Sequence, residues 1–240
     1  MNDFTRYIRI LTIAAGLSMP ALAVDGVTLI NQATLQAGGG LLTITQPGSY
    51  RLAGNLVVNN FTNTLIQITA DNVTFDLNGF SIVCNSCPGG FAGQAWGIDA
   101  EGSYTTIMNG SITGFAGNGI FFNKTGAKVD HLTVSKGGIG ITTAADLSVS
   151  NCQFNSNSNQ AIYAGQANVL VTNSQFIGSV TVGIQMYSGA VIGSVFNGTA
   201  INATGGPVLV SQNMFSGVKP VQSGSYVSPG NNVCAAGTAC

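Results

Sequence analysis

Two six-residue phrases recur in this chain 22 residues apart, VSNCQF at 149–154 and VTNSQF at 171–176. The interval continues in two series of apolar residues, with steps of 22, 20 and 19 in the first and of 21 or 22 in the second. The first series is Phe154, Phe176, Phe196 and Phe215, and the second is Ile98, Ile120, Ile141, Ile162 and Ile184. Self-similarity at a fixed period of this size predicts a solenoid.

The content of each repeat selects the kind of solenoid. Short runs of β-branched residues are broken by Gly, Asn, Ser or Asp, and no repeat contains ten residues of helical periodicity. This pattern excludes helical repeats, and the leucine framework of a leucine-rich repeat is also missing. Three short strands per repeat, joined by turns, make one coil of a parallel β-helix. We therefore predict an all-β parallel β-helix of about 7–8 coils, with equivalent residues stacked about 4.8 Å apart.

Specific residues are expected to stack in this fold. Phe154 and Phe176 would lie one above the other inside the helix, and Asn151 and Asn173 would form an amide ladder at a bend. Both ends of such a stack are open sheet edges that need a cover. We assign residues 24–43 to an N-terminal cap with a short helix, and residues 216–240 to a C-terminal cap or tail. The β-helix domain as a whole spans residues 24–240.

Residues 1–23 have the pattern of a secretory signal peptide. Arg6 and Arg9 precede a short apolar run, and Ala21-Leu22-Ala23 follows it. The run is about half as long as a membrane span, which disfavours an N-terminal anchor. No later segment reaches spanning length, so no membrane span is predicted in the mature chain. We expect an exported protein, either secreted, periplasmic or on the cell surface.

The five cysteines are consistent with export. Cys84 and Cys87 frame one short loop, and Cys234 and Cys240 frame the C-terminal segment, so local disulfides are the simplest arrangement. Cys152 is left over, and we predict a small buried thiol. A zinc site needs about four ligands and the chain has one histidine, so no metal site and no cofactor are predicted.

Charged residues are few. After removal of residues 1–23, five basic and seven acidic residues remain, which gives a net charge of 5 − 7 = −2. The basic residues do not cluster, which argues against a nucleic-acid partner.

Two phrases near the N-terminus carry a family resemblance, ITQPGSYRLAGNLVV at 44–58 and ITADNVTFDLNGFSI at 68–82. The chain resembles the parallel β-helix proteins of the pectin lyase-like superfamily, and in particular its small exported bacterial members. The resemblance implies a right-handed helix and a preference for extracellular polysaccharides. The superfamily includes lyases, hydrolases and epimerases, but also adhesins without known catalysis, so the fold alone does not decide the function.

No catalytic motif of these enzymes is complete. The chain lacks the paired aspartates and Gly-His-Gly of polygalacturonase-like enzymes and the clustered acids of pectate lyase-like enzymes. Asp130-His131 matches only part of an epimerase-like Asp-Pro-His-Asp motif. A histidine beside a carboxylate can act as a general base. The alternative is a solvated turn before the buried run that starts at Leu132, and we favour that alternative.

A better candidate lies on the strand after each repeated glycine. If Ile98 points inward, Asp99 and Glu101 point outward about 7 Å apart. The same register places the following residues outward on later coils: Phe121, Asn123, Thr142, Tyr163, Gln185 and Tyr187. Outward aromatic rings beside amides and carboxylates suit sugar rings. Two carboxylates at this spacing would also serve an inverting glycoside hydrolase. The alternative is an ordinary outer sheet face whose aromatics favour β structure.

The most probable function on this reasoning is non-catalytic binding of polysaccharide by an exported β-helix protein. One alternative is a polysaccharide lyase or glycoside hydrolase that acts on acidic polysaccharide, with Asp99, Glu101, Asp130 and His131 as weak catalytic candidates. The other is a purely structural surface protein.

Overall fold

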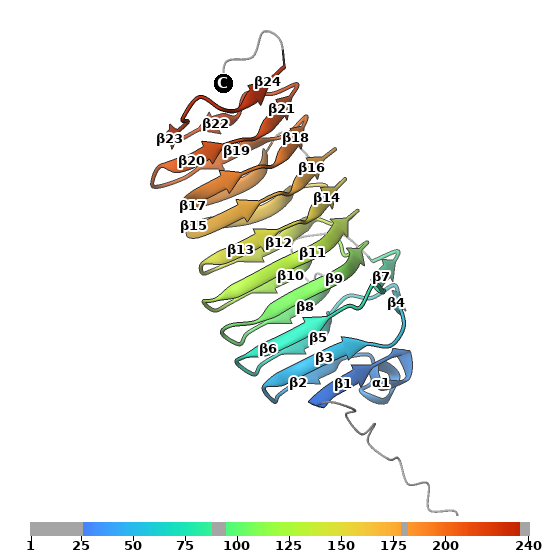
Figure 1. Cartoon of the computed structure of the whole chain (residues 1–240). Helices are drawn as coiled ribbons and strands as arrows, with labels where there is room; N and C mark the ends of the chain where they lie inside the picture. The colour runs from blue at the N-terminus through green and yellow to red at the C-terminus, as the bar shows by residue number, and fades with distance from the viewer. Residues whose placement is uncertain (1–25, 88–94, 179–181, 236–240) are drawn as a thin grey trace, which may run out of the picture.

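The computed structural model describes residues 26–87, 95–178 and 182–235, which wind into a parallel β-helix of about nine coils (Figure 1). The fold predicted from the repeat is confirmed, with slightly more coils than expected. The extra coils lie at the ends, where the sequence had suggested caps. The predicted signal peptide, residues 1–23, lies outside the described residues.

The strands form three stacks that run the length of the helix, and each stack receives one strand, or one part of a longer strand, from each coil. Stack 1 contains β2 (Leu42–Ile44), β5 (Thr64–Ile68), β8 (Trp96–Ala100), β10 (Asn118–Phe122), β12 (Ile139–Thr143), the first parts of β15 (Gln160–Thr172) and β17 (Val182–Ile192), β19 (Ala200–Ala203) and β22 (Val221–Ser223). Stack 2 contains β1 (Val27–Ile30), β3 (Gly48–Leu52), β6 (Val73–Asp76), the first parts of β9 (Thr106–Thr113) and β11 (Ala127–Ser135), β13 (Leu147–Ser150), the second parts of β15 and β17, β20 (Val208–Ser211) and β23 (Tyr226–Val227). Stack 3 contains β4 (Leu56–Asn59), β7 (Ser81–Asn85), the second parts of β9 and β11, β14 (Gln153–Asn155), β16 (Gln175–Ile177), β18 (Val195–Asn197), β21 (Met214–Ser216) and β24 (Val233–Cys234).

The repeated apolar residues set the register between coils. In stack 1, Ile98, Ile120, Ile141, Ile162 and Ile184 pair directly with one another along parallel strands. All five are fully buried. Because side chains alternate between the two faces of a strand, these buried isoleucines oblige their neighbours to point outward.

The phenylalanine column on stack 3 is also confirmed. Phe154, Phe176, Phe196 and Phe215 pair in register, and successive ring centroids are 5.1, 4.6 and 4.7 Å apart. The rings are nearly parallel, with interplanar angles of 7°, 8° and 14°. The column therefore forms a continuous aromatic core along four coils.

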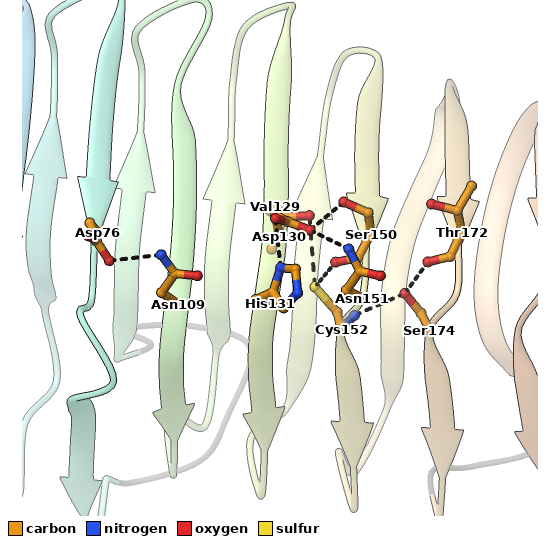
Figure 2. Close-up of polar contacts among 10 residues, drawn as sticks. All are labelled: Asp76, Asn109, Val129, Asp130, His131, Ser150, Asn151, Cys152, Thr172 and Ser174. Carbon is orange, nitrogen blue, oxygen red and sulfur yellow. Dashed lines mark hydrogen bonds and ion pairs between the residues drawn. The ribbon is translucent and has the colours of Figure 1, made fainter.

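On the six successive coils from β9 to β21, the corner between stacks 2 and 3 has one residue in the left-handed backbone region. These residues are Asn109, His131, Asn151, Asn173, Gly193 and Gln212. Asparagine and glycine adopt this conformation more readily than most residues, which explains the recurring Asn. Asn151 and Asn173 occupy equivalent positions at this bend, but the predicted amide ladder is not formed, because the Asn151 amide donates to Asp130 on the preceding coil at 2.9 Å (Figure 2).

A buried polar ladder lies next to this corner. The backbone N–H of Cys152 donates to Ser174 Oγ on the next coil at 3.2 Å (Figure 2). The N–H of Ser174 donates to Ser194 Oγ at 3.1 Å. The N–H of Ser194 donates in turn to Asn213 Oδ1 at 2.8 Å. These side chains satisfy backbone donors that the turn leaves without a strand partner. Cys152 is a buried free thiol, as predicted, and burial raises its pKa to about 12.

The two ends are built differently. Helix α1 (Gln32–Ala37) lies at the N-terminal end and buries Leu35, and Asn31 caps it by accepting from the Thr34 N–H at 3.0 Å. At the C-terminal end, β22, β23 and β24 continue the register of the previous coil. The predicted disulfide between Cys84 and Cys87 is present. The predicted partner of Cys234, Cys240, lies outside the described residues.

We expect Phe176→Ala to destabilise the protein by about 3–5 kcal/mol, because it leaves a cavity between two stacked rings. The measurement is the free energy of unfolding in denaturant. Tyr163→Ala, which truncates an exposed ring on the neighbouring face, is the matched control and should change the free energy by less than about 1 kcal/mol. Equal losses for the two variants would show that the aromatic column does not form the core.

Candidate functional site

The outward column predicted on stack 1 is formed in the predicted register. Asp99, Phe121, Thr142, Tyr163 and Gln185 pair directly along β8, β10, β12, β15 and β17. The pairing continues to Gln67 on one side and Asn202 on the other. We call these residues the stack 1 column. It presents aromatic, hydroxyl and amide groups in a line along the helix axis.

The two tyrosines of this region are exposed, whereas the acid at its start is not. The exposed fractions are 38% for Tyr163 and 47% for Tyr187, which follows Gln185 by two residues. Phe121, Asn123 and Gln185 are half-buried. Asp99 is only 8% exposed, a burial that its position in the repeat does not predict.

A groove of about 980 Å³ runs beside the column. Thr142 and Tyr163 form part of its lining, and turns at residues 114–117, 136–138 and 156–159 form most of the rest. The Lys136 side chain is the one charged group among the described lining residues. Sequence reasoning missed the groove. The glycine-rich turns before each stack 1 strand, such as Gly137-Gly138, were its only signal.

Polar side chains around the column are partly tied to one another. Gln160 Nε2 donates to Gln185 Oε1 at 2.9 Å, and Thr142 Oγ1 donates to Asn118 Oδ1 at 2.7 Å. These bonds hold the amides in fixed positions, and leave the Gln185 amide N–H groups available to a ligand.

Trp96 lies at the start of β8 and was also missed. Its ring packs against Phe121, with centroids 5.0 Å apart and planes tilted by 46°. Its Nε1 is buried and has no hydrogen-bond partner among the described residues. The Trp96–Phe121 pair therefore adds apolar surface beside the column at β8 and β10.

The carboxyl groups of Asp99 and Glu101 lie in different environments. Asn123 Nδ2 donates to Asp99 Oδ1 at 3.2 Å, and Gln67 Nε2 donates to the exposed Glu101 at 2.9 Å. Burial, and secondly the charge of Glu101, raise the pKa of Asp99 from 3.8 to about 6. Asp99 is thus largely protonated at mildly acidic pH and ionised at neutral pH.

The Asp130–His131 pair lies at the corner between stacks 2 and 3, away from the stack 1 column (Figure 2). His131 Nδ1 is 2.7 Å from Asp130 Oδ2, and Ser150 Oγ and Asn151 Nδ2 donate to Asp130 Oδ1 at 2.6 and 2.9 Å. Burial acts to raise the pKa of Asp130, but these hydrogen bonds and the nearby His131 outweigh it and lower the pKa. Ser150 bonds to the carboxylate rather than to the histidine, so the group lacks the nucleophile–base contact of a hydrolytic triad. The arrangement fits the solvated turn that we favoured.

Asp76 has an equivalent role two coils earlier. It accepts from the corner residue Asn109 at 3.1 Å, as Asp130 accepts from Asn151 (Figure 2). Asp76 also forms an ion pair with Arg51 on the preceding coil at 3.2 Å. Both carboxylates therefore join one coil to the next, which is a structural function.

Among the described residues, no three His, Cys, Asp or Glu side chains gather in a way that would hold a metal ion. In the same part of the chain, no helix is both long and apolar enough to cross a bilayer.

Comparison with known proteins leaves the fold and the site geometry as the basis for function, since no family model, curated protein or solved structure matches the chain.

The raised pKa of Asp99 predicts a pH-dependent stability. A carboxyl group with a higher pKa in the folded state binds its proton more tightly there, so stability falls as pH rises from about 4 to about 6. The loss is at most about 3 kcal/mol. Asp99→Asn cannot ionise, so we expect it to exceed the parent in melting temperature at pH 7 and to match it near pH 4.

Glu101→Gln is the control for the electrostatic part of this effect. It removes the second cause of the shift and leaves the burial, so the fall in stability should move to lower pH without disappearing. Parallel curves of melting temperature against pH for the parent and Asp99→Asn would contradict the assignment.

Proposed function

We propose that this chain is an exported, non-catalytic binding module for polysaccharide, with the sugar chain lying along stack 1. One observation carries the proposal: Tyr163 belongs both to the exposed column and to the lining of the 980 Å³ groove. The Tyr163 ring thus lies where the linear array of polar groups meets the groove. Extended polymers of sugars need both features, because their CH faces pack on rings and their hydroxyl groups bind amides and hydroxyls.

The direction of the column supports a linear ligand. Thr142, Tyr163 and Gln185 come from three successive coils, so the array advances along the helix axis by about 4.8 Å per residue. Tyr187 lies two residues after Gln185 on the same strand, so it widens the array at that coil. A small compact ligand would contact only part of this array, whereas an extended one would contact several coils.

The environment of the acids supports binding over hydrolysis. Inverting hydrolysis needs one carboxyl group on each side of the scissile bond, and both must reach the substrate. Asp99 is 8% exposed and is bonded to Asn123, while Glu101 is bonded to Gln67. These contacts favour a role in fixing the end of the column.

An enzyme that acts on acidic polysaccharide is the second candidate. It is favoured by the pKa of Asp99, about 6, because a carboxyl group with a raised pKa beside an exposed one is typical of acid–base sites. The resemblance of residues 44–58 and 68–82 to pectin lyase-like proteins supports both candidates equally. The signal-peptide pattern of residues 1–23 supports export, and hence access to extracellular polysaccharides.

We expect Tyr163→Ala and Tyr187→Ala each to weaken binding of an extended polysaccharide about tenfold or more, which corresponds to about 1.4 kcal/mol. Aromatic anchors carry most of the energy of such sites. The measurement is calorimetric titration with polysaccharides selected on a glycan array. Tyr226→Ala, which removes an equally exposed tyrosine from stack 2, is the control and should bind as the parent does. Equal binding by all three variants would exclude the column as the site.

The double variant Asp99→Asn/Glu101→Gln separates the two candidates. A binding module should keep most of its affinity, whereas a hydrolase or lyase should lose its turnover of acidic polysaccharide. Release of unsaturated products or of reducing ends by the parent protein, abolished in the double variant, would overturn the non-catalytic proposal.

A further inference from the structure

The outward column of stack 2 changes character halfway along the helix. After Val27 on β1, its in-register residues are Ser49, Thr74, Thr106, Lys128, Ser148, Leu170, Ala190, Leu209 and Val227. The first five are polar and the last four are apolar. Leu170, Leu209 and Val227 are 43%, 39% and 58% exposed. Because threonine and serine suffice at the same position on earlier coils, strand formation does not explain the later leucines.

The surroundings of this apolar face (Leu170, Ala190, Leu209 and Val227) resemble a protein interface. Asn168 and Ser188 flank it on one side, and Thr172, the half-buried Ile192 and Ser211 flank it on the other. After Asp146, the sequence contains a single charged residue, Lys219. An apolar centre with an uncharged, mainly polar rim and few charges is the usual composition of the centre of an interface.

The shape of the column indicates what covers it. Small and large side chains alternate along it, in the order Ser148, Leu170, Ala190 and Leu209. A shallow hollow of about 410 Å³ lies over the first part of this column, lined by Ser148, Leu170 and Ala190 and, at its N-terminal end, by the charged residues Lys128 and Asp146. The surface therefore offers two projecting leucines and two recesses at intervals of one coil.

This pattern is complementary to itself. If a two-fold axis runs along the strand direction between β15 and β17, Leu170 meets Ala190 of the second copy, and Leu209 meets Ser148 of the second copy. Both leucines of each copy then fill recesses of the other, as an isologous contact requires. The same operation places the aliphatic stem of Lys128 against Val227 of the second copy. The low charge of these coils leaves little repulsion between two copies.

We propose that two copies of this chain associate face to face through the apolar face of stack 2, with their helix axes antiparallel. This inference goes beyond the proposed function and does not depend on it, because the stack 1 column stays outside the contact. The face spans only about four coils, so the association is weak and reversible.

Sedimentation velocity of the protein purified from an exporting host, over about 1 to about 200 µM, tests the proposal. We expect a monomer–dimer equilibrium that Leu209→Lys weakens about tenfold or more. Leu209→Lys places an unpaired charge in the contact. Ser148→Glu should also weaken the association, but less, because Lys128 lies in register on the preceding coil and can pair with the new carboxylate. Thr74→Lys introduces the same charge in the polar half of the column and is the matched control. A parent protein that stays monomeric throughout, or whose dimer tolerates Leu209→Lys, would overturn the proposal.

The double variant Ser148→Glu/Leu209→Lys tests the register. In one chain these positions lie three coils apart, about 14 Å, so they do not pair within a copy. Across the proposed two-fold axis each lysine meets a glutamate of the second copy, twice per dimer, so the double variant should recover association lost in both single variants. Melting curves confirm that each variant is folded. Failure of the folded double variant to recover would exclude the proposed pairing.

Discussion

The in-register stacking of coils is the constraint on which the rest of the molecule depends. Each residue inside the helix packs on its equivalents one coil before and one coil after, as the stacked Phe176 ring shows. Parallel strands supply the hydrogen bonds between coils, but the apolar columns determine which residues meet. A shift of one residue would bring Ile162 outward and Tyr163 inward. The register of the core therefore determines which side chains align on the outer surfaces.

This dependence explains which features the sequence could predict. The isoleucine and phenylalanine series have nearly constant steps, so the pairing of Tyr163 with Gln185 could be predicted from the spacing of these repeated residues. The burial of Asp99 did not follow, because it depends on the packing of neighbouring side chains. The groove was not predicted from the sequence either, because its depth depends on the heights of three turns, and these turns have no common sequence. The last coil was missed because it lacks the repeated residues: Val221 follows Ile201 in stack 1, and Cys234 follows Phe215 in stack 3.

Carboxylates in this fold are used mainly to join coils. Asp76 and Asp130 accept from corner asparagines of later coils, and Asp99 accepts from Asn123. Five aspartates accept a hydrogen bond from the next coil, whereas Glu101 accepts from Gln67 on the preceding coil. Asp130-His131 resembles part of an active site because a corner needs a residue that tolerates the left-handed conformation, and histidine is one of those.

The buried ladder at the corner has a direction. The backbone N–H of Cys152 is satisfied by Ser174, that of Ser174 by Ser194, and that of Ser194 by Asn213, always on the following coil. A corner is therefore incomplete until the next coil is in place, and a buried donor without a partner costs about 1–3 kcal/mol. During synthesis the N-terminal coils emerge first, so the most recently formed corner lacks the acceptor that the next coil will supply. Loss of a C-terminal coil therefore leaves the backbone donor of the preceding corner without its acceptor, whereas loss of an N-terminal coil removes acceptors such as Val191 O, which accepts from the buried Asn213 amide.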